Sequence, residues 1–341
     1  MPDELRLIAA FAVAFGVTAI CVPVAIRIAH RTRFYDVPAG YKGHAAPTPY
    51  LGGAAVVAGF GVPFALTAGA SDVVVPVLAG SLVLAAIGTL DDRLAVWPLI
   101  RLAAELAVGA MLYSAGLGWS GLGSDAANLL LTLVFVVGVV NAYNLMDNLD
   151  GAAASVGAAS AVCVAVIAAV EGEIAPAAMA AALAGACAGF LPANLARPAR
   201  IFLGDGGSMP LGFVVAGAIM ALPEAPGSGG AAIPLAVVFV GLPALDTFLV
   251  VVSRLRRGVS VYRGGRDHLT HRLFARLRST RRVALALATA QVAVSLLAIG
   301  LYEAGGAVML GGGLACLAIG VAVVAMLESP RLGAAPQASS A

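Results

Sequence analysis

The chain has 341 residues, of which 61% are hydrophobic and only 11% charged, and its formal net charge is +2. An ordinary soluble domain has about 45–50% apolar and about 25% charged residues, so these charged side chains are too few to cover a soluble protein of this size. The composition therefore predicts an integral membrane protein. It excludes a disordered chain, a coiled coil, a disulfide scaffold and a nucleic-acid binder.

Eleven stretches are apolar enough to predict transmembrane helices, which need about 20 predominantly apolar residues. These stretches are 7–26, 51–71, 73–90, 106–124, 126–146, 151–170, 174–196, 206–223, 225–245, 283–302 and 304–327. The strands of a membrane barrel are shorter and alternate in polarity, which favours an all-α polytopic bundle. We expect residues 1–328 to form one membrane domain and residues 329–341 to be a disordered cytoplasmic tail.

The positive charges are distributed unevenly between the two predicted membrane faces. Nineteen of the twenty Lys and Arg residues fall in alternate loops on one face, and only Arg6 lies opposite. Loops rich in Lys and Arg stay in the cytoplasm. The pattern therefore predicts an N-terminus outside and a C-terminus inside, which agrees with an odd number of spans.

Asp91 and Asp92 stand side by side at the end of the third stretch, before Arg93. Adjacent carboxylates repel each other and need a metal ion or another cation as a partner. A solvated helix cap is the alternative for an acidic pair at this place.

Polar residues recur every three positions in NAYNLMDNLDG at 141–151, namely Asn141, Asn144, Asp147 and Asp150, followed by Gly151. At a helix end this spacing produces a slowly drifting polar stripe, and the glycine suits a sharp change of direction. The alternative is a polar turn that caps itself with its Asn and Asp side chains. Four evenly spaced amides and acids directly after an apolar run favour a functional site.

Glycines flank an acid in PARIFLGDGGS at 198–208, where Asp205 lies between Gly204 and Gly206. Backbone N–H groups in such a turn approach a phosphate closely, and the helix start that follows favours anions. Asp205 also offers the oxygen ligands that hard divalent cations take. A glycine-rich turn between two membrane helices is the alternative.

A cationic segment over 254–282 holds ten arginines and the motif DHLTHRL at 267–273. Arginines in such a loop attract anionic lipid, at about 1 kcal/mol per cation near the surface. That role does not explain His268 and His271, and no cysteine or further histidine accompanies them to make a zinc site. Binding or positioning an anion is the favoured role for this pair.

Acids suited to Mg²⁺, a glycine-rich anion turn and a cationic loop thus gather on one predicted face of the membrane. The combination is typical of phosphoryl transfer, in which catalysis is mostly positioning and neutralisation of phosphate charge. A site at a membrane implies that one phosphate substrate is a lipid.

These motifs resemble, in chain order, those of the polyprenyl-phosphate N-acetylhexosamine-1-phosphate transferase family, which is of the glycosyl transferase 4 type. The resemblance is carried by HAAPTPYLGG at 44–53, DDR at 91–93, NAYNLMDNLDG at 141–151, PARIFLGDGGS at 198–208 and DHLTHRL at 267–273. It implies transfer of a sugar 1-phosphate from a UDP-sugar to polyprenyl phosphate, with release of UMP. It also implies a need for Mg²⁺, with Mn²⁺ as a substitute, and a cytoplasmic active site in the plasma membrane. A homodimer is left open.

The resemblance also implies roles for single residues. Asp205 would be the principal metal ligand, and Asp91 and Asp92 would lie at the phosphate centre. Asp91 would deprotonate or orient the lipid phosphate and would also bind the metal. Asn144 and Asp147 would border the site of the metal and the diphosphate. An acid that acts as base or nucleophile and direct attack by the lipid phosphate both stay open, and direct attack needs fewer assumptions.

The remaining implied residues serve the donor. The loop at 149–151 would meet the uracil, with Phe202 stacked on it, and the two histidines would hold the diphosphate or the sugar. The full implied set for donor and diphosphate is Asn141, Asn144, Leu149, Asp150, Gly151, Phe202, Arg101, Arg266, Arg272, His268 and His271.

Two motif details bear on the sugar. The sequence has PTPYLGG and HLTH where the peptidoglycan branch, which uses UDP-MurNAc-pentapeptide, typically has PTMGG and three histidines. The chain resembles more the branch that uses UDP-GlcNAc to start surface-polymer glycans. The departures at Ala46, Leu99 and Asn148 affect the expected diphosphate contacts and leave the reaction class intact.

A transporter is the alternative from a different class of protein. Transporters place ionisable residues near the bilayer midplane, whereas only Glu105 and Asp246 fall within or near a predicted span here. Asp246 also fits the family pattern, but helix packing and pairing with an arginine are equally open for it.

Overall fold

The computed structural model describes residues 2–36, 47–69, 71–223, 232–261 and 264–329. Within these ranges the chain forms thirteen helices and one short two-stranded sheet. The helices are α1 (Asp3–Thr32), α2 (Gly52–Thr67), α3 (Val74–Leu94), α4 (Pro98–Ser114), α5 (Asp125–Met146), α6 (Ala152–Val170), α7 (Ile174–Asn194), α8 (Asp205–Met220), α9 (Ala232–Phe239), α10 (Gly241–Arg256), α11 (Leu269–Leu277), α12 (Thr280–Ala304) and α13 (Gly306–Leu327). The strands β1 (Tyr35–Asp36) and β2 (Thr48–Pro49) pair antiparallel, with Tyr35 opposite Pro49.

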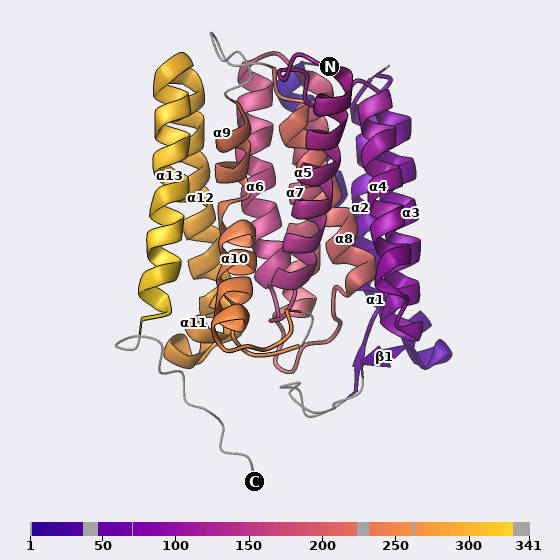
Figure 1. The fold of residues 1–341 in the computed structure, drawn as a ribbon. Coiled ribbons are helices and arrows are strands. Elements are labelled where there is room, and N and C mark those ends of the chain that lie inside the picture. The colour runs from indigo at the N-terminus through magenta and orange to yellow at the C-terminus, as the bar shows by residue number, and fades with distance from the viewer. Residues whose placement is uncertain (1, 37–46, 70, 224–231, 262–263, 330–341) are drawn as a thin grey trace.

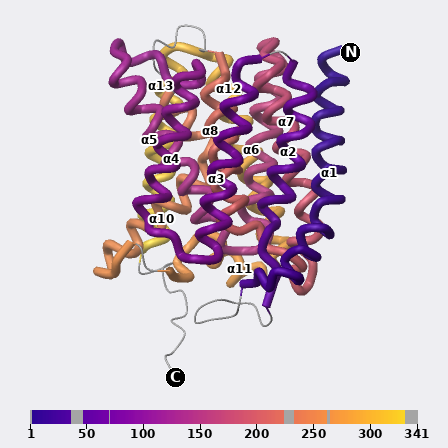
Figure 2. Tube along the Cα trace, turned by 90° about the vertical axis from the view of Figure 1, so that its right-hand side faces the viewer, coloured from indigo at the N-terminus to yellow at the C-terminus, as the bar shows by residue number. Residues whose placement is uncertain are grey.

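Most of the helices run along one common axis (Figure 1). α1 starts at the upper end of the bundle, and α13 finishes at the lower end (Figure 1 and Figure 2). The lower end holds the last turns of α3 and α5, the first turns of α4 and α8, and all of α11. The four motif regions that the structure describes in full therefore meet at one end of the molecule.

The number of spans differs from the prediction. Seven helices are long and apolar enough to cross a membrane, or eight if the bent pair α9–α10 is one span. The prediction of an all-helical, multi-pass membrane protein is confirmed, and eleven spans are not. The helices α2 and α8 are apolar but have only 16 residues each.

Two predicted spans are wrong in detail. The stretch 106–124 was expected to span, but α4 runs from Pro98 to Ser114, because Arg101 and Glu105 have partners inside the protein and are carried within the helix. The stretch 225–245 begins outside the described residues, and its described part breaks between α9 and α10. The predicted tail also lies, after residue 329, outside them, so the division into domain and tail stays a prediction.

The helix α8 lies at the centre of the bundle. Every residue of α8 after Asp205 is buried, and α3 and α5 pack along it. Around this centre, close helix contacts depend on glycine. A Cβ added at Gly185 or Gly189 of α7 would come within 2.1 or 2.5 Å of the carbonyl oxygens of Phe11 and Phe15 in α1. Small residues four positions apart allow two membrane helices to touch backbone to backbone.

A side chain from α12 holds the break between α9 and α10, where the two helices meet at 90°. The Gln291 amide is fully buried; it donates to the carbonyl of Phe239 at 2.8 Å and accepts the backbone N–H of Leu242 at 3.1 Å. Ser160 also donates to the Phe239 carbonyl. Backbone groups inside a bilayer have no water to bind, so a broken helix persists only where the protein supplies such partners.

We predict that Gln291→Leu destabilises the protein, because it leaves the Leu242 N–H unpaired and removes one of the two donors to the Phe239 carbonyl. Each unpaired buried backbone group costs about 1–3 kcal/mol. The midpoint of thermal unfolding in detergent should fall clearly. Ser295→Ala is the control, since it removes an acceptor of the Gln291 amide and leaves the bonds from Gln291 to Phe239 and Leu242 in place. Equal midpoints for Gln291→Leu and the wild type would contradict this account of the break.

Candidate active site

Two neighbouring carboxylates at the end of α3 serve different partners. Asp91 accepts from the backbone N–H of Val96 at 2.7 Å and from Nη1 of Arg101 at 2.5 Å. Asp92 instead accepts the backbone N–H groups of Asp205 and Gly206, at 3.1 and 3.3 Å. Consecutive helix positions point about 100° apart, which separates the two side chains. Asp92 thus caps the first turn of α8, whose N–H groups have no partner within their own helix.

Glycine lets α3 and the start of α8 come together. A Cβ on Gly88 would lie 2.3 Å from the carbonyl oxygen of Asp205, and Gly204 has a φ of +71°. From the other side, the backbone N–H groups of Gly52 and Gly53 donate to the carbonyls of Phe202 and Leu203 at 3.1 and 2.9 Å. The described part of HAAPTPYLGG at 44–53, called the first-loop motif, therefore fixes the turn before Asp205. Residues 44–46 of that motif, including Ala46, lie outside the described residues.

The Arg101 guanidinium joins residues from three other helices. Its Nη1 donates to Asp91 and, at 3.1 Å, to Oδ2 of Asp205, and its Nη2 donates to Oδ1 of Asn144 at 2.8 Å. Asn144 in turn donates to Oδ1 of Asp205 at 2.7 Å and to Ser208 at 3.0 Å. The ends of α3, α4, α5 and α8 are thus tied together by one continuous polar network.

Negative charge dominates this network. The carboxyl groups of Asp91, Asp92, Asp147 and Asp205 lie near one another, and the Arg101 guanidinium contacts two of them, Asp91 and Asp205. Removal from water, reinforced by Asp205 and Asp92, raises the pKa of Asp147 well above its usual range. Carboxyl groups held together in this way favour the binding of a further cation.

A buried amide that sequence analysis missed connects the two loops of the site. Asn194, the last residue of α7, accepts the backbone N–H of Gly151 at 2.6 Å and donates to the carbonyl of Ile201 at 3.0 Å. It is 4% exposed. Its signal was a single polar residue at the end of an apolar run, but that pattern does not say which loops the amide reaches.

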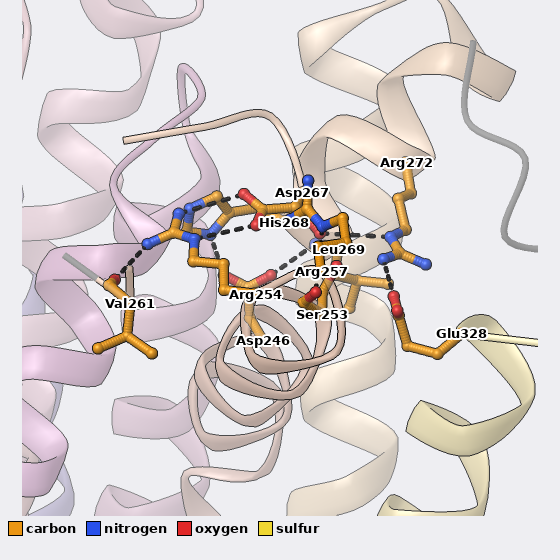
Figure 3. Close-up of polar contacts among 10 residues, drawn as sticks. All are labelled: Asp246, Ser253, Arg254, Arg257, Val261, Asp267, His268, Leu269, Arg272 and Glu328. Atoms are coloured by element: carbon orange, nitrogen blue, oxygen red, sulfur yellow. Dashed lines mark hydrogen bonds and ion pairs between the residues drawn. The ribbon is translucent and has the colours of Figure 1, made fainter. Parts of the chain in front are cut away.

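The histidine motif is anchored on α10 (Figure 3). Asp267 accepts two hydrogen bonds from Arg254, at 2.9 and 3.1 Å, and a third from Arg257 at 2.6 Å. Burial raises the pKa of the Asp267 carboxyl, but the hydrogen bonds and the charge of Arg254 outweigh it and bring the pKa below its usual value. The Arg254 side chain is only 5% exposed. Part of the cationic loop is therefore a fixed scaffold.

The next residues of the motif are held just as closely. His268 and the backbone N–H of Leu269 both bind the carboxylate of Asp246, which is fully buried. Thr270 donates to the side chain of Asn148, directly after Asp147. The first turn of α11 is thus joined to α10 and to the end of α5, beside the carboxylate cluster. Asp246 pairs with a histidine and not with an arginine.

Three residues expected to bind substrate have partners within the protein. The Asn141 amide donates to Glu105 at 2.6 Å and to the carbonyl of Val137. The Gly151 N–H is bound by Asn194. Arg272 binds the carboxylate of Glu328 and, at 2.9 Å, the carbonyl of Leu327, so it joins α11 to the end of α13.

Further residues that were expected to bind the UDP-sugar lie at the same end of the molecule. Asp150 lines a cavity of about 230 Å³ together with Arg197, Phe274 and Arg278. The Phe202 ring meets that of Tyr50 edge-on, with centroids 6.2 Å apart, and Tyr50 belongs to the motif HAAPTPYLGG at 44–53. His271 lies near His268, with ring centroids 6.0 Å apart.

Comparison with known proteins identifies the family. The model of glycosyl transferase family 4 matches residues 74–222. The decaprenyl-phosphate N-acetylglucosaminephosphotransferase of Mycobacterium tuberculosis (strain CDC 1551 / Oshkosh) is 36% identical over 282 residues, covering 71% of this chain and 69% of the relative. The enzyme of the same name from Mycolicibacterium smegmatis is 34% identical, over 82% and 77% of the two chains. The undecaprenyl-phosphate alpha-N-acetylglucosaminyl 1-phosphate transferase of Escherichia coli K12 is 29% identical, over 82% and 79%.

The chain belongs to glycosyl transferase family 4. Membership confirms the predicted family and the prediction of a sugar-1-phosphate transferase, and it removes the transporter alternative. The matched region of this family 4 enzyme runs from α3 to α8 and contains the whole carboxylate network. It ends before the histidine motif on α11.

We predict that His271 in this family 4 enzyme makes the fold sensitive to acid. Burial, with the nearby charges of His268 and Arg266, lowers the pKa of His271 to about 4. An unfolded histidine has a pKa of about 6.5, so the unfolded state binds more protons between these values. The stabilisation is complete above about pH 6.5 and is lost as the pH falls toward 4.

The thermal midpoint of His271→Gln should therefore fall less between pH 7 and pH 4.5 than that of the wild type. Arg276→Gln removes an exposed charge from the same helix and changes no group that titrates in this range. It should show the wild-type difference. An equal pH dependence for His271→Gln and the wild type would refute the low pKa.

Proposed function

We propose that this enzyme transfers GlcNAc 1-phosphate from UDP-GlcNAc to polyprenyl phosphate, at the cytoplasmic face of the plasma membrane. The observation that carries the proposal is the contact of one guanidinium with Asp91, Asp205 and Asn144, which come from three motifs of the family. The names of the relatives, which act on N-acetylglucosamine and a decaprenyl or undecaprenyl phosphate, support the choice of sugar and lipid. They favour it over the MurNAc-pentapeptide alternative.

In the proposed reaction an oxygen of the lipid phosphate attacks the phosphorus that carries the sugar. The bond from that phosphorus to the bridging oxygen breaks, and UMP leaves with the bridging oxygen and its electron pair. The attacking group is already an anion, so no protein nucleophile is needed. Asp91 orients the lipid phosphate, and Arg101 balances the charge of the acids around it.

The oxygen ligands that the carboxylate network offers are suited to Mg²⁺. Asp91 and Asp205 contact the same nitrogen of Arg101, at 2.5 and 3.1 Å, so their carboxylates are close enough to share one cation. Among the described residues no group of three His, Cys, Asp or Glu is placed to hold a metal. Mg²⁺ usually takes one or two carboxylates and completes its shell with water and substrate phosphates, so two suffice. Asp205 and Asp91 would hold the ion, which would neutralise charge on the diphosphate.

The remaining site residues divide between holding the fold and holding the donor. Asp92 acts through the first turn of α8, which it caps, and so keeps Asp205 in place. Asp150 and its cavity receive the uracil, next to the loop that Asn194 fixes. His268, directly before α11, and His271, on its first turn, meet the diphosphate or the sugar. The Lys and Arg residues in the loops at this end of the helix bundle support the proposal that it faces the cytoplasm.

We predict that Asp205→Asn lowers turnover by more than about 100-fold, because a metal ion contributes several kcal/mol to such a transfer. The assay uses purified protein in detergent with Mg²⁺, undecaprenyl phosphate and labelled UDP-GlcNAc, and follows label into the lipid phase and UMP into water. Asp125→Asn is the matched control, because Asp125 is exposed at the far end of α5. Normal turnover by folded Asp205→Asn would refute the metal assignment.

The same assay tests the donor. Label and UMP should appear together with UDP-GlcNAc and should both disappear with EDTA. Transfer only from UDP-MurNAc-pentapeptide or UDP-GalNAc would change the sugar and keep the reaction class. Absence of transfer from every donor, by protein shown to be folded, would overturn the proposed function.

A further inference from the structure

A buried carboxylate on α10 contacts the histidine motif at two points. Oδ2 of Asp246 lies 2.8 Å from Nδ1 of His268, and its Oδ1 accepts the backbone N–H of Leu269 at 2.5 Å. Asp246 is fully buried, and the His268 side chain is 5% exposed. Both oxygens of the carboxylate are therefore committed to α11.

The contact is one half of a matched pair of charges. Asp246 and Arg254 lie eight positions apart, so they share one face of α10. Asp246 of α10 binds His268 of the following loop. Arg254 of α10 binds Asp267, the neighbour of His268 in that loop. A shift of the loop by one residue would bring like charges together, so the pairing fixes the register of the loop on α10.

The bond to Asp246 also decides which ring nitrogen of His268 is free. A carboxylate only accepts, so Nδ1 must carry a hydrogen and donate it. Nε2 is then the nitrogen left for a substrate, in a ring whose orientation is fixed. In the serine protease triad, replacing the corresponding Asp by Asn keeps the geometry but lowers kcat about 10⁴-fold, because the tautomer changes.

We propose that Asp246 is a positioning residue for the transfer: it fixes the ring and the protonation pattern of His268 and the first turn of α11. The inference rests on the proposed function, because it assumes that His268 meets the donor. Asp246 itself touches no substrate and acts through His268.

The variant Asp246→Asn tests this with little change of shape. The Leu269 N–H needs an acceptor, so the new amide turns its oxygen there and presents its NH₂ group to His268. Nδ1 must then accept, and the hydrogen moves to Nε2. We expect kcat to fall by about 10- to 100-fold, as for partners that orient a functional histidine, while KM for UDP-GlcNAc changes less. Thr247→Val, which removes a buried hydroxyl with no bonding partner, is the matched control and should keep full activity.

A double-mutant cycle separates positioning from a general structural role. In the His268→Gln background, Asp246→Asn should cost almost nothing further, because both changes remove the same interaction. A full additional loss in that background would overturn the proposal. Equal kcat for Asp246→Asn and the wild type would also overturn it.

Nitrogen NMR reads the tautomer without any turnover. The chain has four histidines, so histidine labelling gives few signals, and His268→Gln assigns the one of interest. Wild-type protein should show a hydrogen on Nδ1, and Asp246→Asn should show it on Nε2. If that variant does not fold, the wild type alone decides, because Nδ1 without a hydrogen would refute the proposal. A wild type with the expected signal but no transfer would instead count against the proposed function.

Discussion

The arrangement of the site depends on the attraction between one guanidinium and the acids that surround it. Arg101 contacts Asp91, Asp205 and Asn144, so that with Arg101 itself the ends of four different helices are joined. Acids packed together away from water repel each other, so without a cation the ends of these helices would separate. The same excess of negative charge that Arg101 only partly balances makes the place suitable for a metal ion and for the phosphates that bind with it.

A second constraint comes from the backbone, because a membrane offers no water to groups that leave regular helices. At several breaks of the chain, near the site and within the bundle, a buried or partly buried polar side chain binds the freed groups. Asp92 serves the start of α8, Asn194 serves the turns at Gly151 and Ile201, and Gln291 serves the bend after α9. These residues make irregular backbone possible next to the helix ends that carry the functional groups.

Much of the site could be predicted from the sequence, and less of the fold. Acids and amides in apolar surroundings are costly, so Asp91, Asn144 and Asp205 were recognisable as functional candidates, and the structure brings them together. Hydropathy gave most helices but misplaced α4, since an apolar window excludes Arg101 even when the helix carries it. It also joined α9 to α10, because the composition of a stretch contains no information about a 90° bend.

Sequence patterns also fail to separate polar residues that face a substrate from those that face the backbone. Asn141 and Asn144 stand one helical turn apart in the same motif, yet one binds Glu105 inside the bundle and the other binds Asp205. Their spacing is equally suited to both roles, and only the helix packed opposite each side chain decides between them. The same holds for Asp91 and Asp92, whose side chains point about 100° apart around α3. Asp91 therefore binds Arg101, whereas Asp92 caps α8. Residue type therefore identifies the region of the site, and helix packing determines the role of each polar residue within it.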